Sequence, residues 1–188
     1  RGGGGFSWLI LRGERHGGSS LHIVDVGIDT GEIVECREYF FPDWCRKPID
    51  YQQIAYKENL TLLKGFIRGI EKEHEFEITA KEDHLSTYWP RLNTELQGFI
   101  NWNWKLVDIE CFICAFDDPY IGASTFINNQ RVFVKDCRAD FEDGAFHPFQ
   151  AGLIYRRARN YLFVATCEGG LVIGDIRNEA GESMIDQI

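Results

Sequence analysis

The sequence predicts a mixed α/β fold, with a sheet-and-helix half followed by a half made of short strands. One observation is the segment 21–34, which reads as an apolar strand, a short loop containing glycine and a second strand beginning near Glu32. Leu21 and Ile23 alternate with Val24 and Val26, so both faces of the first strand are expected to be buried in a covered sheet. The other observation is the series of short apolar runs and turn signals after residue 120.

The loop between the first two strands contains a candidate catalytic residue. Asp25, Gly27, Asp29 and Gly31 lie within this loop. Loops at the ends of buried strands are where α/β folds place reactive groups, and this favours Asp29 as a catalytic carboxylate. An aspartate close to glycine also commonly starts a turn, and that interpretation stays open at this point.

The remaining elements of the first half follow from residue patterns. Glycines at 2–5 precede an apolar helical segment at 6–12. The second strand is expected to continue to residue 40, and a long helix is expected from Asp50 to about Lys72. Asp50 and Gln53 fit a capping box at the start of that helix, and the apolar residues that follow keep helical spacing.

Residues 85–104 are expected to form an ordered connector between the two halves. They contain the aromatic residues Tyr88, Trp89, Trp102 and Trp104. Aromatic side chains in a connector either pin two domains together or line a binding cleft, and both interpretations remain open. A helix is expected next, at 105–116, ending before Pro119 because proline cannot continue it.

The second half is predicted to be a small closed β-barrel. Its short strands are expected at 124–127, 131–134, 153–157, 161–166 and 171–177. Asn128 and Asn129 lie between the first two of these strands, and such a pair is typical of a tight hairpin turn.

The charge of the chain argues against a nucleic-acid or membrane partner. The net charge is −9, and proteins that bind nucleic acid usually present a basic patch. After Gln97 the chain has 8 Lys and Arg residues against 13 Asp and Glu residues. The one basic concentration, Arg156, Arg157 and Arg159, lies where a hairpin turn is expected. No apolar run approaches the roughly 20 residues that span a bilayer.

The 6 cysteines are expected to be free thiols, which indicates a reducing, cytoplasmic environment. Cys111 and Cys114 have the spacing of a metal or redox motif, but the chain offers no second pair to complete a zinc site. They also lie inside an apolar helical pattern, which favours packing in the core. We therefore predict no metal site.

The chain begins with Arg1, and its single methionine is Met184. A chain without an initiating methionine is expected to be a fragment, a processed product or a trimmed sequence.

Three segments together resemble the folate-dependent formyltransferases, a family that includes methionyl-tRNA formyltransferase and the N-formyltransferases of nucleotide-linked amino sugars. The first is residues 1–34, with Arg1-Gly2, Trp8 and the run from Asp25 through Gly27-Ile28-Asp29-Thr30-Gly31. The second is residues 86–104, with the run from Ser86 to Arg91 and Ile100-Asn101-Trp102. The third is residues 113–126, with Pro119-Tyr120 and Gly122-Ala123. The order and spacing of the three segments make the resemblance specific.

The resemblance implies a domain organisation. Residues 1–84 would be the C-terminal part of a Rossmann-like formyltransferase domain, residues 85–104 the aromatic-rich connector, and residues 105–188 a small OB-like barrel domain. The family's catalytic set is an Asn, a His two residues later and an Asp. Only the Asp matches here, at Asp29, and no Asn-x-His occurs in the chain. The N-terminal part of the catalytic domain is therefore expected to be missing, which would leave this chain inactive by itself.

The resemblance also implies N10-formyltetrahydrofolate as the formyl donor, with Asp25, Val26, Gly27 and Ile28 meeting its pterin ring. The acceptor would be a primary amine. The charge balance favours a small one, such as a nucleotide-linked amino sugar or an amino-acid-like amine. Tyr88, Trp89 and Trp102 could stack a base, and Arg91 could contact a phosphate.

Several alternatives stay open for the function. Methionyl-tRNA formyltransferase and formyltetrahydrofolate hydrolase would use the same donor. A non-catalytic interaction module or an inactive fragment would retain only the scaffold. A homodimer is compatible with the sequence, since the edge of an incomplete sheet is prone to association.

Overall fold

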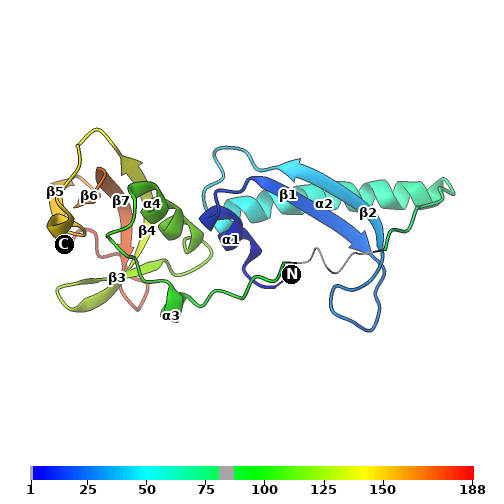
Figure 1. The fold of residues 1–188 in the computed structure, drawn as a ribbon, viewed down its shortest axis with the longest axis horizontal. Coiled ribbons are helices and arrows are strands. Elements are labelled where there is room, and N and C mark those ends of the chain that lie inside the picture. Colours follow the sequence, from blue (N-terminus) through cyan, green and yellow to red (C-terminus); the bar gives the residue numbers. More distant parts are fainter. Residues whose placement is uncertain (1, 81–86) are drawn as a thin grey trace.

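The computed structural model describes residues 2–80 and 87–188. These residues form two lobes along an elongated molecule, a helix-and-hairpin lobe and a strand lobe (Figure 1). Arg1, Ser86 and the expected domain boundary between residues 84 and 85 lie outside the described residues. The division into residues 1–84, 85–104 and 105–188 therefore stays a prediction.

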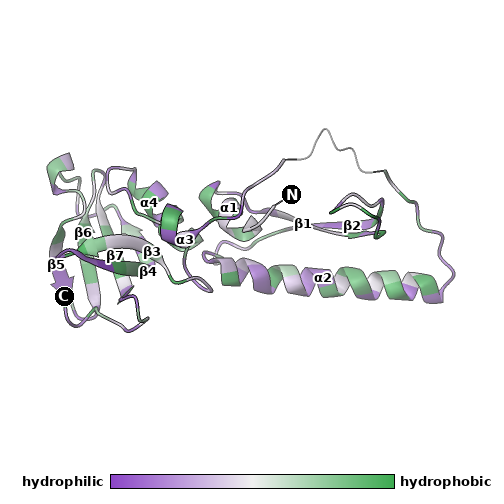
Figure 2. Ribbon diagram, turned by 90° about the horizontal axis from the view of Figure 1, so that it is seen from below, coloured by the Kyte–Doolittle hydropathy of each residue, from purple (hydrophilic) through white to green (hydrophobic). Residues whose placement is uncertain are grey.

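The helix-and-hairpin lobe contains two helices and two strands. Its elements are α1 (Gly5–Leu11), β1 (His16–His22), β2 (Ile33–Phe40) and α2 (Pro48–Glu71). The two strands pair antiparallel, with His16 opposite Phe40 and His22 opposite Ile33. Helix α2 runs along one face of this hairpin (Figure 2). Alternate residues of β1 are exposed, as expected for a strand covered on one side only.

The prediction of an apolar strand through residues 21–26 is wrong. Strand β1 ends at His22, and Val24 and Val26 are 88% and 110% exposed. The reason is a turn closed by the Asp25 carboxylate, which accepts hydrogen bonds from the Gly27 amide at 3.0 Å and the Thr30 hydroxyl at 2.5 Å. This turn takes the apolar residues out of the ladder. In the described part of the chain the sheet has two strands and therefore no covered centre.

The predicted long helix is confirmed, but its start differs from the expected capping box. Helix α2 begins at Pro48, and a proline in the first turn costs no hydrogen bond. Asp50 is the third helical residue, and its carboxylate accepts from the backbone amides of Arg46 at 2.9 Å and Lys47 at 3.0 Å. It therefore closes the turn that precedes the helix and does not pair with Gln53 as predicted.

The strand lobe contains the helices α3 (Thr94–Gln97) and α4 (Leu106–Ala115), the 3₁₀ turn η2 (Pro148–Gln150), and the strands β3 (Ala123–Ile127), β4 (Gln130–Asp140), β5 (Ile154–Ala158), β6 (Tyr161–Ala165) and β7 (Gly170–Arg177). The predicted helix and strands are confirmed to within a few residues, apart from β4, which continues well beyond its expected end. Asn128 and Asn129 have φ angles of 50° and 65°, as a tight hairpin turn requires.

The strands of this lobe form one antiparallel sheet in the order β3-β4-β7-β6-β5. Within the described residues β3 and β5 stay at the two edges, so the predicted closure of the barrel is not confirmed. The connector adds one backbone contact at the β3 edge, where Phe99 bridges to Ser124.

The main core lies between α4 and this sheet. Leu106, Ile109 and Ile113 of α4 are fully buried, and Leu171 of β7 faces them from the sheet side of the same core. Helix α1 packs against α4 as well, so the two lobes share part of one core. In the described residues, no helix is long and apolar enough to cross a bilayer.

Candidate functional site

The loop between β1 and β2 is a sharply turned, exposed segment. It closes where the Ile23 amide donates to the Glu32 carbonyl at 2.9 Å. Side chains are excluded at two positions. A Cβ at Gly31 would lie 1.6 Å from the Ile23 carbonyl oxygen, and one at Gly27 would lie 2.1 Å from the Thr30 hydroxyl. The loop therefore needs glycine at both positions to keep its shape.

The two aspartates of this loop have different roles in its geometry. The Asp25 carboxylate is used by the turn, and the hydrogen bond from the Thr30 hydroxyl, followed by that from the Gly27 amide, lowers its pKa. Asp29 has a φ of 56°, in the left-handed region that aspartate tolerates better than most residues. Its side chain is exposed, like those of Ile28 and Thr30.

The apolar side chains around Asp29 are exposed. Val24, Val26 and Ile28 are 88%, 110% and 89% accessible. These side chains alternate with Asp25 and Gly27 along the loop, so the loop presents apolar groups beside exposed backbone. Such a surface suits a flat, partly apolar ring that hydrogen-bonds along its edge.

Trp89 of the connector is fixed to the first lobe. The Trp89 ring packs on the Trp8 ring with 4.9 Å between centroids. The Arg12 guanidinium lies over the Trp89 ring, 5.2 Å from the ring centroid. The Trp8 indole N–H also donates to the Pro90 carbonyl at 2.8 Å. These contacts, together with the bridge between Gly2 and Trp89, tie the connector to the N-terminal glycines.

Trp102 is fixed to the strand lobe instead. Its indole N–H donates to the Thr125 hydroxyl at 3.0 Å, and its ring lies against Gly152, where a Cβ would come within 2.9 Å of it. The structure thus brings Tyr88, Trp89 and Arg91 together on one stretch of connector but does not bring Trp102 to them. Tyr88 is 72% exposed, and Arg91 has no hydrogen bond or ion pair among the described residues.

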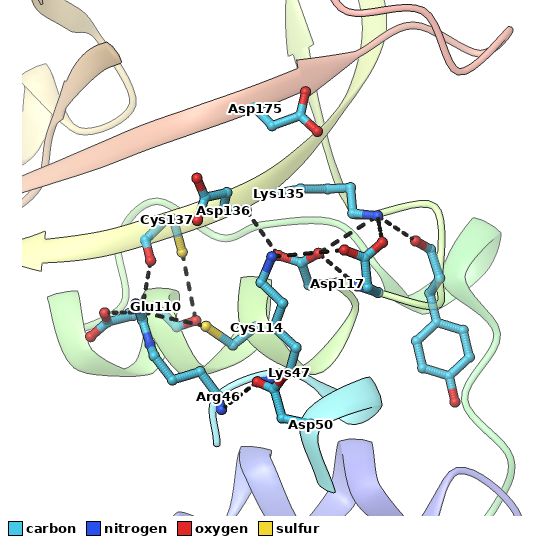
Figure 3. A network of polar contacts seen from close by, with 12 residues as sticks. Arg46, Lys47, Asp50, Glu110, Cys114, Asp117, Lys135, Asp136, Cys137 and Asp175 are labelled. Atoms are coloured by element: carbon cyan, nitrogen blue, oxygen red, sulfur yellow. Dashed lines mark hydrogen bonds and ion pairs between the residues drawn. The ribbon is translucent and has the colours of Figure 1, made fainter. Parts of the chain in front are cut away.

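A polar network joins the two lobes between the start of α2 and the end of α4 (Figure 3). Asp117, 1% exposed, lies 3.2 Å from the Lys47 ammonium and 3.6 Å from the Lys135 ammonium. It also accepts from the Asp136 amide at 2.8 Å. Burial, the largest single influence, would lower the pKa of Lys47, but the charge and hydrogen bond of Asp117 together with the charges of Asp136 and Asp118 leave the pKa raised. Asp118 completes the network through a short hydrogen bond from Lys135.

Arg46 makes a second set of contacts between the lobes. Its guanidinium donates to the Glu110 carboxylate and, at 2.7 Å, to the Cys137 carbonyl. It also lies 3.6 Å from the Cys114 sulfur. We use the name inter-lobe clamp for Arg46 and Lys47 together with the strand-lobe residues that they contact, which are Glu110, Cys114, Asp117, Asp118 and Cys137.

The Cys111 and Cys114 pair lies on α4 beside this clamp. Burial raises the pKa of Cys111, whereas interaction with the Cys137 thiol, and then the Arg46 charge, lowers that of Cys114. All 6 cysteines are free thiols. No group of three or more potential ligands in the described residues could hold a metal ion.

The basic cluster at the β5–β6 turn is partly neutralised. Arg156 pairs with Asp143 and stacks on Phe163, with 4.0 Å between the guanidinium and the ring centroid. Arg157 lies 3.5 Å from Asp186. These contacts offset the charges of two of the three arginines in the cluster.

Sequence reasoning did not find the inter-lobe clamp. Lys47 and Asp117 are 70 positions apart in the chain, so no local pattern links them. The one available signal was the pair of aspartates that precedes Pro119, which marked the end of a helix and gave no information on its partners.

Comparisons with known proteins bear on both lobes. Residues 93–186 match the family model described as the C-terminal domain of formyl transferase. Among curated proteins, methionyl-tRNA formyltransferase of Ruminiclostridium cellulolyticum is 26% identical over 185 residues, covering 98% of this chain and 57% of that protein. The enzyme of the same name from Thermodesulfovibrio yellowstonii is 30% identical over 185 residues, covering 98% and 56%. The chain thus spans little more than half the length of these relatives.

Solved structures share the fold. HypX from Aquifex aeolicus superposes with a TM-score of 0.72 at 21% identity, covering 97% of this chain and 32% of that one. An N-formyltransferase from Helicobacter canadensis, in complex with folinic acid and dTDP-3-aminofucose, superposes with a TM-score of 0.61 at 20% identity, covering 92% and 60%.

Proposed function

This chain belongs to the folate-dependent formyltransferase family, and from that premise we propose that the protein containing it transfers a formyl group from N10-formyltetrahydrofolate to a primary amine. The observation that carries the proposal is the exposed, sharply turned loop with Asp29 at its outer end. Because the chain spans about 57% of its relatives, the activity is proposed for the whole protein. By itself the chain supplies the Asp of the catalytic set and lacks the Asn and His.

The residues of the loop fit a folate donor. The Asp25 carboxylate and the Gly27 amide are engaged in the turn, and Asp25, Val26, Gly27 and Ile28 are all exposed. The remaining peptide groups of these residues can match the alternating donors and acceptors along the edge of a pterin. Exposed Val26 and Ile28 would cover the faces of the ring. Bound there, N10-formyltetrahydrofolate supplies the formyl group.

Asp29 would act as the proton acceptor. An amine that attacks a carbonyl carbon must lose a proton, and a carboxylate within hydrogen-bond distance, or one water away, can take it. Asp29 is exposed on a turn whose backbone shape the two glycines fix, so its carboxylate remains accessible to a substrate. Family resemblance adds a second role, the orientation of the catalytic His.

The acceptor is proposed to be a small amine on a nucleotide-linked sugar. Tyr88 and Arg91 support this, because their side chains are exposed on the same stretch of connector. Trp89 and Trp102 were also candidates for stacking a base. Their contacts with Trp8 and Thr125 make them better suited to holding the connector in position. The solved N-formyltransferase with bound dTDP-3-aminofucose is similar over most of this chain.

A second candidate acceptor is methionyl-tRNA. It is favoured by the curated relatives, which are methionyl-tRNA formyltransferases. The excess of carboxylates after Gln97 and the pairing of Arg156 with Asp143 oppose it. Formyl transfer by the full-length protein to a panel of amino-sugar nucleotides and to methionyl-tRNA decides between the two.

The experiment that tests the proposal is Asp29→Asn in the full-length protein. Asparagine keeps the shape and tolerates the left-handed backbone but cannot accept the proton. We expect kcat for formyl transfer to fall by about 10²–10⁴-fold, with unchanged thermal unfolding and unchanged binding of folinic acid. Asp43→Asn, another exposed loop carboxylate, serves as the control. Activity near that of the parent protein would remove Asp29 from the mechanism.

A further inference from the structure

A small cavity lined partly by thiols lies between the two lobes, beside the inter-lobe clamp. Its volume is about 180 Å³. The first lobe contributes Arg46 and Tyr51 to its walls, and α4 contributes Cys111 and Cys114. The loop that holds Asp29 is not part of this lining. A role for the cavity is therefore separate from the proposed function.

Two buried thiols from different elements meet beside this cavity. Cys114 of α4 and Cys137 of β4 are 6% and 4% exposed, and both sulfur atoms point into the same space between the helix and the strand (Figure 3). The two thiols are hydrogen-bonded to each other. Because Cys114 also lines the cavity, a small molecule that enters the cavity reaches one member of the pair directly.

The surroundings of the pair divide its charge unequally. The Arg46 guanidinium lies 3.6 Å from the Cys114 sulfur. The hydrogen bond with Cys137, and then the Arg46 charge, lower the pKa of Cys114 in spite of its burial and of the nearby Glu110 and Asp117 carboxylates. The same hydrogen bond, and then burial, raise the pKa of Cys137. Cys114 is thus suited to hold the negative charge and Cys137 the proton, and the thiolate is the nucleophilic form of cysteine.

We propose that Cys114 is a peroxide-reactive thiol and that Cys137 closes a disulfide with it. The Cys114 thiolate attacks one oxygen of hydrogen peroxide. The S–O bond forms as the O–O bond breaks, and the departing hydroxide takes up a proton to give water. Cys137 then loses its proton and attacks the Cys114 sulfur, so that the S–S bond forms as the S–O bond breaks, and the second hydroxide leaves as water. Two thiols are oxidised by two electrons, and the peroxide is reduced to two waters.

The size of the cavity selects the oxidant. A volume of about 180 Å³ holds a few molecules the size of water, and hydrogen peroxide is only slightly larger than water. The disulfide of a tripeptide such as glutathione does not fit. Cys45 and Cys111 line the same cavity, but burial raises the pKa of both thiols. They are therefore expected to remain reduced when Cys114 reacts.

Oxidation would act on the contact between the lobes. Arg46 belongs to the first lobe and faces the Cys114 sulfur and the Cys137 carbonyl, the latter at 2.7 Å, on the strand lobe. A disulfide carries no negative charge, so its formation removes one of the groups that attract the guanidinium. The ion pair of Arg46 with Glu110 does not involve either sulfur. The modification thus weakens one contact of the inter-lobe clamp and leaves others in place.

Peptide mapping of the full-length protein after treatment with hydrogen peroxide tests the proposal. We expect a cross-linked peptide joining Cys114 to Cys137, formed at least about tenfold faster than Cys36 is oxidised, and cleaved again by dithiothreitol. Cys36 is an exposed thiol and serves as the internal reference. A bulky aromatic disulfide reagent should show the opposite preference and modify Cys36 first. A link between Cys111 and Cys114, or no link at all, would overturn the proposal.

Three variants separate the two steps. In Cys137→Ser the sulfenic acid at Cys114 has no thiol to resolve it, and we expect mass spectrometry to find it trapped by dimedone. In Cys114→Ser the Cys137 thiol should stay reduced. Cys167→Ser, which removes a cysteine that does not line the cavity, should behave as the parent protein. Circular dichroism verifies that each variant folds. A dimedone adduct on Cys137 in Cys114→Ser, or none on Cys114 in Cys137→Ser, would refute the assignment, and if a variant does not fold, the map of the parent protein decides.

Discussion

Asp25 and Asp29 belong to one loop and differ in their local geometry. The Asp25 carboxylate accepts hydrogen bonds from the Gly27 amide and the Thr30 hydroxyl, whereas Asp29 has an exposed side chain and a positive φ. The residue types at these positions could be picked out from the sequence. The turn could not, because the alternation from Leu21 to Val26 has the same period as a strand, and side-chain hydrogen bonds overrode it.

The turn at Asp25 should depend on its acceptor atoms. In Asp25→Ala the Gly27 amide loses its partner, and we expect its hydrogen exchange to accelerate about tenfold. Asp25→Asn keeps one acceptor oxygen and should retain much of the protection. Asp186→Ala, at an exposed site in the strand lobe, is the control. Equal protection in Asp25→Ala and the parent would show that the glycines alone fix the turn.

The same turn should depend on pH in a defined direction. Its hydrogen bonds lower the pKa of Asp25 in the folded chain. The stabilisation is therefore present above the ordinary aspartate range and is lost as pH falls through the lowered folded value. Amide protection at Gly27 should hold at neutral pH and disappear only in acid, and Asp25→Asn should abolish this dependence.

Some helices and strands could be predicted well from their local sequence, and others could not. Helix α4 and strands β6 and β7 have strong apolar patterns and appear where they were expected. Strand β1 has the sequence His-Gly-Gly-Ser-Ser-Leu-His, whose glycines and serines have low strand propensity, and only its pairing with β2 and its contact with α2 make it a strand. Tertiary contacts therefore determine that this segment is a strand, and a local sequence pattern carries no information about them.

Helix α4 provides a direct test of which packing contacts contribute most to the free energy of unfolding. Ile109 is fully buried between α4 and the sheet, whereas Val107, on the same helix, is 44% exposed. Ile109→Ala should lower the free energy of unfolding by about 2–5 kcal/mol, since it leaves a cavity. Val107→Ala should change it by no more than about 0.5 kcal/mol. Urea denaturation measures both, and similar losses would place the core elsewhere.

At the scale of the whole molecule, the two lobes are held by the inter-lobe clamp and by the packing of α1 on α4. The loop with Asp29 belongs to one lobe, whereas a cavity of about 350 Å³ between the N-terminal glycines, the connector and the end of α4 has walls from both. Its lining extends from Gly3 to Tyr120, so its existence depends on the relative placement of the lobes. No sequence pattern could have revealed it, because Ser7 and Tyr120 are distant in the chain and each has an unremarkable local context.

The clamp should contribute strongly to stability through its buried carboxylate. Asp117→Asn removes a charge that is 1% exposed and faces Lys47 and Lys135. We expect the free energy of unfolding to fall by about 3 kcal/mol, because breaking a buried ion pair is costly and Asp118 alone would remain to face the two lysines. Asp186→Asn, whose pair with Arg157 is exposed, should cost less than about 1 kcal/mol. Thermal and urea unfolding of both variants measure the difference, and equal losses would contradict it.

The position of the clamp also determines how a rotation between the lobes would displace α2. Arg46 and Lys47 hold only its first turn, while the helix continues for 24 residues, or about 36 Å at the usual rise per residue. The helix is packed on the β1–β2 hairpin, with Arg37 of β2 paired to Glu58, so helix and hairpin would turn together, and a rotation of about 5° at the clamp would carry the far end of α2 through about 3 Å. Because the β1–β2 hairpin lies along this helix, a small shift at the junction would be magnified at the loop that holds Asp29. A small rotation between the two lobes would therefore change the position of the loop that holds Asp29 relative to the strand lobe.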